Sequence, residues 1–260
     1  MDDEIRAYYE IGLERDRLAQ GYSRLEFVRT QELLSRYLPP APAKVLDVGG
    51  GPGAYAAWLA EAGHQVRLVD ATPLHVQQAL ELANGRFEAV AGDARELGEP
   101  DGSYDVVLLL GPLYHLLERE ERLAALGEAR RVLRPGGLLA AAGISRFASL
   151  LDGLLRDLLD DEGWALVQRD LADGKHLPRG NHALFTNAYF HRPEELQAEV
   201  EGAGFEVEGF FGVEGPGWVR AESLDDERIL DNIVRVARAV EQEPAIIGAS
   251  AHFLAIARRK

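Results

Sequence analysis

Short apolar runs alternate with longer stretches of helical period between residues 44 and 144. The apolar runs have the length of buried strands, and most of the intervening segments place apolar residues three or four positions apart, as amphipathic helices do. This alternation predicts an α/β fold, in which a parallel sheet is covered by helices on both faces. The predicted strands comprise residues 44–49, 65–70, 86–93, 103–111 and 138–144.

Further predicted elements precede and follow the alternating strands and helices of residues 44–144. Residues 1–39 predict an N-terminal helical cap of two helices, the second starting with a capping box formed by Ser23 and Glu26. Residues 40–260 predict one domain with a lid inserted at about residues 146–190, where the alternation lapses into apolar helical stretches and a polar loop. The later predicted elements are a helix over residues 193–204, strands over residues 205–215 and 249–259, and a charged helix over residues 222–242.

The composition restricts the class of protein. A chain of 260 residues with 47% hydrophobic residues is long enough for one large domain with a sizeable core. Its formal net charge of −15 disfavours binding to nucleic-acid phosphates, so a small molecule is the expected partner. There is no cysteine, which excludes disulfides and thiolate chemistry. The N-terminus lacks a signal peptide and no apolar run reaches the ~20 residues of a membrane span, so a cytoplasmic location is expected.

The segment KVLDVGGGPG, residues 44–53, joins a predicted strand to a predicted helix through a glycine turn. Such a corner suits a nucleotide-like ligand, because glycines let the ligand approach bare backbone and adopt positive φ angles. One interpretation is the dinucleotide fingerprint, since Gly49, Gly51 and Ala54 have the required spacing and Asp70 follows about 20 residues later. An NAD-dependent oxidoreductase is therefore one hypothesis.

Further motifs favour a different cofactor. VRLVD ends at residue 70, GDA covers residues 92–94, DVVLLLGPLYHL begins at residue 105, and EARRVLRPGG ends at residue 137. Together with VLDVGGGPG, these segments resemble the class I S-adenosylmethionine-dependent methyltransferases over roughly residues 40–144, in the same order and spacing. The resemblance implies a doubly wound, Rossmann-like sheet of seven strands that is mostly parallel, with the last strand antiparallel. It also implies methyl transfer to a small-molecule acceptor.

The resemblance implies roles for individual residues. Asp47 is expected to hold the methionine amino group, Asp70 both ribose hydroxyls, and Asp93 the exocyclic amine of adenine. Ala71 is expected to pack beside the adenine, and Ala94 to donate its amide to the ring. The remaining residues are expected to let the backbone approach the cofactor or to line its methionine end, and they are Gly49, Gly50, Gly51, Gly53, Gly92, Leu110 and Gly111. Arg29 of the N-terminal cap is expected to meet the methionine carboxylate.

The candidates for catalysis follow the predicted strands. Tyr114 and His115 come directly after the strand at residues 103–111, and His191 lies in the aromatic segment FTNAYFHRP. A histidine in such a position serves as a general base or merely packs against the lid. Glu214, at the end of a later strand, is a further candidate, whereas we interpret His252 on the last strand as structural.

Some alternatives remain open at this point. The seven histidines lack the spacing of metal ligands, so no metal site is expected. A non-catalytic sensor that binds S-adenosylmethionine is an alternative to the enzyme, although no DNA-reading element is apparent. The acceptor and its attacking atom are not specified by these motifs, and the protein is expected to be a monomer or a homodimer.

Overall fold

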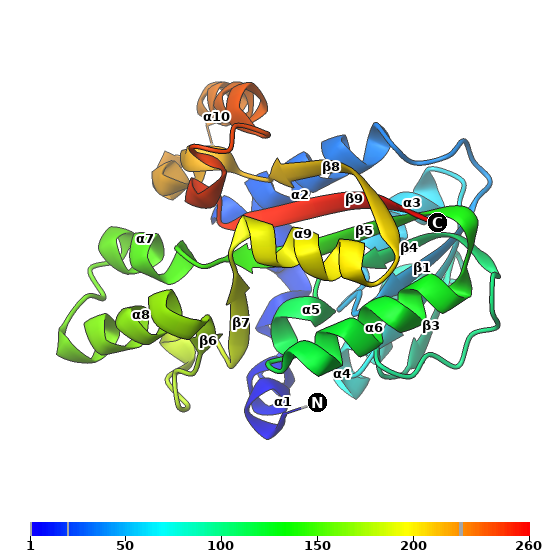
Figure 1. Ribbon diagram of the computed structural model, residues 1–260, viewed down its shortest axis with the longest axis horizontal. Helices are drawn as coiled ribbons and strands as arrows, with labels where there is room; N and C mark the ends of the chain where they lie inside the picture. Colours follow the sequence, from blue (N-terminus) through cyan, green and yellow to red (C-terminus); the bar gives the residue numbers. More distant parts are fainter. Residues whose placement is uncertain (1, 20, 224–225) are drawn as a thin grey trace.

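A β-sheet lies at the centre of the protein (Figure 1). The structure is a computed structural model that describes residues 2–19, 21–223 and 226–260. Five parallel strands run in the order β3-β2-β1-β4-β5, and β9 pairs antiparallel with both β5 and β8. The predicted doubly wound, mostly parallel sheet with an antiparallel last strand is thus confirmed, but the sheet has nine strands in the described residues instead of the predicted seven. The strands are β1 (Lys44–Val48), β2 (Gln65–Asp70), β3 (Glu88–Ala91), β4 (Tyr104–Leu109), β5 (Leu133–Ser145), β8 (Phe205–Gly212) and β9 (His252–Arg259).

Helices cover both faces of this sheet because successive strand residues face opposite sides. Val45 and Leu108 belong to the hydrophobic core on the side of α2, α3 and α4, whereas Leu46 and Val107 belong to the core under α6 and α9. The α-helices are α1 (Asp3–Glu10), α2 (Gly21–Ser35), α3 (Ala54–Glu61), α4 (Pro73–Ala83), α5 (Pro112–His115), α6 (Arg119–Val132), α7 (Ala148–Leu155), α8 (Asp161–Asp173), α9 (Pro193–Gly202) and α10 (Glu227–Val240). The 3₁₀-helices are η1 (Leu13–Ala19), η2 (His182–Leu184), η3 (Gly215–Ser223) and η4 (Ile247–Ala249).

The predicted insertion at residues 146–190 is more regular than its sequence suggested. Helices α7 and α8 project beyond one end of the sheet (Figure 1), and a short hairpin of β6 (Lys175–His176) and β7 (Ala188–His191) follows them. Strand β7 joins the sheet, because β4 ends opposite Ala141 and leaves the edge of β5 free at Ile144 and Ser145. A four-residue strand is too short to show a period, so the sequence pattern missed it.

Arg29 has a structural position in the fold instead of the predicted contact with a cofactor. Its side chain is fully buried between α2 and the end of α10. The guanidinium donates to Glu32, to Glu241 Oε2 at 2.5 Å and to the carbonyl oxygen of Val213 at 3.2 Å. Arg29 does not line the cavity described below, so the prediction that it binds the methionine carboxylate is wrong.

We expect Arg29→Ala to lower the free energy of unfolding by about 3 kcal/mol, because the substitution leaves two carboxylates without their buried cation. This value is the lower end of the usual range for removing one partner of a buried ion pair, since the carboxylates of Glu32 and Glu241 keep some contact with water. Denaturation with urea measures the change. Arg228→Ala is the control, because Arg228 is 87% exposed, and it should change the free energy of unfolding by less than about 0.5 kcal/mol. A loss of less than about 1 kcal/mol in Arg29→Ala would contradict the assignment.

No helix within the described ranges combines the length and the apolar character that a membrane crossing requires.

Candidate functional site

The loop between β1 and α3 turns through the left-handed region of backbone conformation. The φ angles are +68° at Gly49, +56° at Gly51 and +94° at Gly53, and residues with a side chain are strained at such angles. Gly53 does not line the adjoining cavity. A Cβ on Gly53 would lie 3.1 Å from Phe87 and 3.3 Å from Ala79. The role of Gly53 is therefore the close packing of α3 against the core, which corrects its prediction as a cofactor contact.

The carboxylate of Asp47 lies beneath this loop. Its side chain is fully buried, and a Cβ on Gly50 would lie 2.6 Å from Asp47 Oδ2. Within the described residues, neither carboxylate oxygen has a hydrogen-bond partner. Burial and then the neighbouring Asp70 raise the pKa of Asp47 to about 7. A buried carboxylate without a partner on a cavity wall suits a cationic ligand group such as an ammonium.

Asp70, at the end of β2, is held by the surrounding backbone. Its Oδ2 accepts from the amide of Gly51 at 2.9 Å, and its Oδ1 accepts from the amide of Thr72 at 2.8 Å. His75 in the first turn of α4 places Nδ1 3.3 Å from the same Oδ1. Sequence reasoning missed His75, because a spacing of five residues across a strand-to-helix turn is not a recognisable motif. These contacts orient the Asp70 carboxylate at the rim of the cavity.

A cavity, which we call the cofactor cavity, lies along the carboxyl ends of the parallel strands, where ligands bind in doubly wound sheets. Asp93 lies at its far end, where its carboxylate accepts from Arg95 Nη2 at 2.6 Å. The hydrogen bonds from Arg95 lower the pKa of Asp93. The predicted cofactor residues that line the cavity are Asp47, Gly49, Gly50, Gly51, Asp70, Ala71, Gly92, Asp93, Ala94, Leu110 and Gly111.

Segment η1 and helix α2 form another wall of the cofactor cavity, where η1 contributes Arg17 and α2 contributes Glu26. The guanidinium of Arg17 joins the two elements. Its Nη1 donates to Glu26 Oε2 at 2.6 Å and to Ser23 Oγ at 3.2 Å, and its Nε donates to Glu14 Oε1 at 2.7 Å. Ser23 and Glu26 thus bind a side chain instead of capping α2, so the predicted capping box is wrong. The sequence holds many arginines in this region, and only the fold shows that Arg17 faces the cavity while Arg29 faces the core.

His115 and Tyr114 both line the cofactor cavity, as the candidates for catalysis were expected to do. The Nε2 atom of His115 lies 2.6 Å from the hydroxyl of Tyr9, and its Nδ1 lies 3.4 Å from the carbonyl oxygen of Asn187. Because a carbonyl only accepts, Nδ1 carries the proton and Nε2 accepts from Tyr9. Burial lowers the pKa of His115 to about 4. The ring is therefore neutral at pH 7, and its only lone pair is already occupied.

His191 lines neither this cavity nor the one beside it. Its ring is fully buried, with Nε2 3.4 Å from Glu199 Oε2 on α9 and with the ring of Tyr189 at a centroid distance of 4.7 Å. Strand β7 points successive side chains to opposite faces, so Phe190 reaches the cavity beside α7 whereas His191 faces α9. The prediction of a catalytic His191 is wrong.

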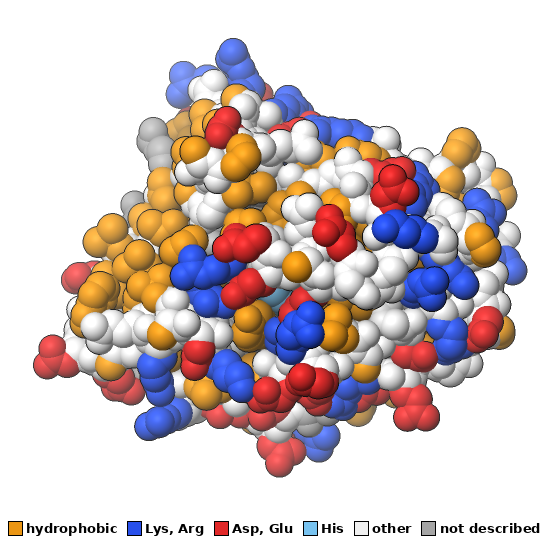
Figure 2. Space-filling view, viewed as in Figure 1, with side chains coloured by type: hydrophobic (Ala, Val, Ile, Leu, Met, Phe, Trp, Pro, Cys, Tyr) orange, Lys and Arg blue, Asp and Glu red, His pale blue; other side chains and the backbone are white. Residues whose placement is uncertain are grey.

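A second cavity, which we call the acceptor cavity, adjoins the first beneath α7 and α8. Tyr9, Glu14, Arg17 and Tyr114 line both cavities, so the two meet at these side chains. Hydrophobic side chains also gather on the outer surface over α7 (Figure 2), where Leu154 is exposed. The apolar side chains that line the acceptor cavity include Ile144, Leu158, Leu159, Leu166, Val167, Phe185, Phe190 and Trp218.

Comparisons with known proteins agree with this arrangement. A family model described as a methyltransferase domain matches residues 45–137. The chain is 34% identical over 198 residues to the methyltransferase GfsG of Streptomyces halstedii, covering 74% of this chain and 62% of that protein. It is 35% identical over 204 residues to the uncharacterised methyltransferase Rv3342 of Mycobacterium tuberculosis, covering 76% of this chain and 77% of that protein. It is 26% identical to the ubiquinone biosynthesis O-methyltransferase of Mesorhizobium japonicum, with 78% and 79% covered.

Solved structures share the fold. An S-adenosylmethionine-dependent methyltransferase from Methanosarcina mazei superposes with a TM-score of 0.61 at 21% identity, covering 87% of this chain and 96% of that chain. The chain belongs to the class I S-adenosylmethionine-dependent methyltransferases.

Proposed function

We propose that this protein transfers the methyl group of S-adenosylmethionine to a small-molecule acceptor held beneath α7 and α8. The observation that carries the proposal is the junction of two cavities at Tyr9, Glu14, Arg17 and Tyr114. Methyl transfer is an in-line displacement, which requires the nucleophile and the methyl group to meet along one axis. Such alignment contributes about 7–11 kcal/mol to catalysis, and two adjoining cavities provide it.

The buried carboxylate of Asp47 and the carboxylates of Asp70 and Asp93 in the cofactor cavity support S-adenosylmethionine as its ligand. Asp47 would hold the methionine ammonium, Asp70 the ribose hydroxyls, and Asp93 with Ala94 the adenine. The unpartnered carboxylate of Asp47 and the absence of side chains at Gly49 and Gly50 support this set. The bound cofactor supplies an electrophilic methyl group. Leu110 and Gly111 would line its methionine end, together with Gly51, Ala71 and Gly92 along the same wall.

The acceptor cavity favours a largely apolar small molecule, since aliphatic and aromatic side chains form most of its wall. The net charge of −15 disfavours a nucleic-acid acceptor. Several relatives of this chain are named as O-methyltransferases of ubiquinone biosynthesis, which supports a hydroxyl as the attacking group. We propose that residues 1–39 and 146–190 act as cap and lid, which exclude water from the reacting groups.

Tyr114 and His115 would separate the two cavities and orient the acceptor. His115 accepts from the hydroxyl of Tyr9, so it fixes a second aromatic ring at the junction. This role needs no proton transfer at His115.

Replacing Asp70 with asparagine or alanine should weaken the binding of S-adenosylmethionine and S-adenosylhomocysteine by about 100-fold. The reason is the loss of charge-assisted hydrogen bonds to the ribose, each worth about 1.5–3 kcal/mol. Calorimetric titration with the two ligands and with NAD measures the affinities. Asp231→Asn, an exposed change on α10, serves as the control and should bind like the wild type. Binding of NAD alone by the folded wild-type protein would overturn the proposed function.

The affinity for S-adenosylmethionine should depend on pH through Asp47. Its pKa in the free protein is raised to about 7, so the carboxyl is protonated below that pH and cannot pair with an ammonium. We expect the association constant to rise toward about tenfold per pH unit below pH 7 and to level off above it. Titrations from pH 5.5 to 8.5 measure the slope, and Asp47→Asn should flatten it. An equally steep slope in Asp47→Asn would show that another group titrates.

A further inference from the structure

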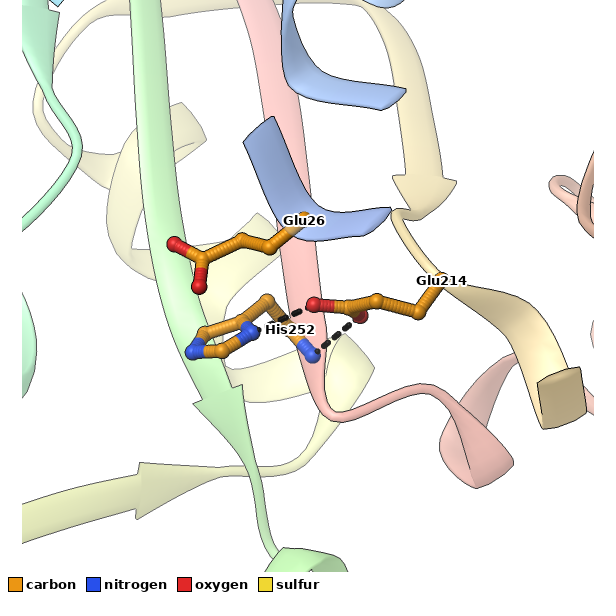
Figure 3. Close-up of side chains that lie close together, drawn as sticks. All are labelled: Glu26, Glu214 and His252. Carbon is orange, nitrogen blue, oxygen red and sulfur yellow. Dashed lines mark hydrogen bonds and ion pairs between the residues drawn. The ribbon is translucent and has the colours of Figure 1, made fainter. Parts of the chain in front are cut away.

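Glu214, a candidate for catalysis in the sequence, pairs with His252, which the sequence indicated as structural (Figure 3). Glu214 follows β8, is fully buried, and directs Oε1 to His252 Nδ1 at 2.6 Å. Its Oε2 accepts from the backbone amide of His252 at 2.9 Å and from Ser250 Oγ at 2.8 Å. Three hydrogen bonds therefore fix both oxygens of the carboxylate. A carboxylate only accepts, so Nδ1 of His252 carries a proton.

The imidazole of His252 lies where the two cavities meet. His252 lines the acceptor cavity, and Glu26 lines the cofactor cavity. One side-chain ligand atom each of Glu26, Glu214 and His252 lies within 4.8 Å of the others, although the three residues come from separate elements (Figure 3). No residue in the described ranges forms a hydrogen bond with Nε2 of His252. The side chain is 17% exposed, and so Nε2 remains available to a ligand.

We infer that His252 is the catalytic residue that binds the oxygen of the acceptor through Nε2, and that Glu214 is its positioning residue. This inference rests on the proposed function. At neutral pH His252 is an imidazolium, because its pKa is raised to about 9. The acceptor therefore binds as an oxyanion, whose proton is released to solvent, and the Nε2–H group of His252 donates to that oxygen. As the oxygen bonds to the methyl carbon, the carbon–sulfur bond breaks and its electron pair stays on sulfur, so the oxyanion and the sulfonium become a neutral ether and a neutral thioether.

The charges around His252 select an acidic hydroxyl. Burial lowers the pKa of His252, but Glu214 and Glu26 more than reverse this effect and raise it to about 9, against a smaller opposing effect of Arg17. A phenol ionises near pH 10, and an adjacent imidazolium that lowers the pKa of the phenol by about 1–3 units brings the phenolate within reach of neutral pH. An aliphatic alcohol ionises several units higher, near the pKa of water at about 15.7. The acceptor is therefore a phenol or an enol, carried on an apolar skeleton that fits the cavity wall.

A metal ion is the other interpretation of Glu26, Glu214 and His252. Arg17 argues against it, because its guanidinium already binds Glu26 at 2.6 Å and supplies the cation at this position. Nδ1 of His252 and both oxygens of Glu214 are likewise occupied.

The test uses 4-nitrophenol, whose ionised form absorbs visible light, with the protein saturated by S-adenosylhomocysteine. We expect the wild type to bind the probe as the phenolate below the pKa of the free phenol. The apparent pKa should fall by about 1–3 pH units, because an opposite charge lies within contact distance. In His252→Gln the bound probe should stay protonated at the same pH. In Glu214→Gln the apparent pKa of the bound probe should lie between its values in the wild type and in His252→Gln, since the imidazolium loses its carboxylate partner.

His64→Gln is the matched control, because His64 accepts from the amide of Ala43 and lines neither cavity. It should reproduce the wild-type spectrum. With a phenolic acceptor, His252→Gln should also lower kcat by about 10²–10³-fold.

Calorimetry with S-adenosylhomocysteine, performed on the wild type and on each variant, separates a failure of the proposed function from a failure of the role of His252. Failure of the wild type to bind it would overturn the proposed function. Binding of S-adenosylhomocysteine by wild type and variants, combined with a phenol that stays protonated in the wild type or ionises equally in His252→Gln, would overturn the role of His252. A wild-type complex that does not bind 4-nitrophenol at all would overturn the phenol as acceptor class.

Discussion

Parallel strands end at a common edge, and the whole site depends on this constraint. β1, β2 and β4 are neighbours in register, so the segments that follow Val48, Asp70 and Leu109 emerge side by side. The glycine loop then passes closely over the buried Asp47, since a Cβ on Gly50 would lie 2.6 Å from Asp47 Oδ2. A Cβ on Gly111 would lie only 3.1 Å from the carbonyl oxygen of Gly49. Three segments separated in sequence thus form one continuous wall of the cofactor cavity.

The charges along this wall are mostly negative, as a cationic cofactor requires. Asp47 has no hydrogen-bond partner in the described residues, and its burial and the neighbouring Asp70 raise its pKa, because both disfavour a negative charge there. Arg17 pairs with Glu14 and Glu26 at the junction of the cavities and offsets one of their two charges. A ligand with an ammonium and a sulfonium offsets the remaining charge, which couples cofactor binding to the ionisation of Asp47.

Two histidines near the junction differ in what their partners permit. His115 contacts a carbonyl and a hydroxyl, and its lowered pKa keeps it neutral, so its task is to hold Tyr9 in place. His252 contacts a buried carboxylate, which raises its pKa and leaves Nε2 open toward the acceptor. The same side chain thus serves as a positioning group in one place and as a cation that binds the acceptor oxygen in the other, and the partner atoms decide between these roles.

The sequence by itself was sufficient for the fold class and for many of the residues that line the cofactor cavity. Asp47, Asp70 and the glycine loop lie within a few residues of a strand end, so local pattern and known motif order locate them. The acceptor side was decided only by the tertiary structure. The cavities are lined by Arg17 instead of Arg29 and by His252 instead of His191, because of how α2, β7 and β9 pack. The physical reason is that the packing of each side chain depends on elements distant in the sequence, as that of Arg29 on α2 depends on Glu241 after α10, and no local periodicity records which face of each element meets the others.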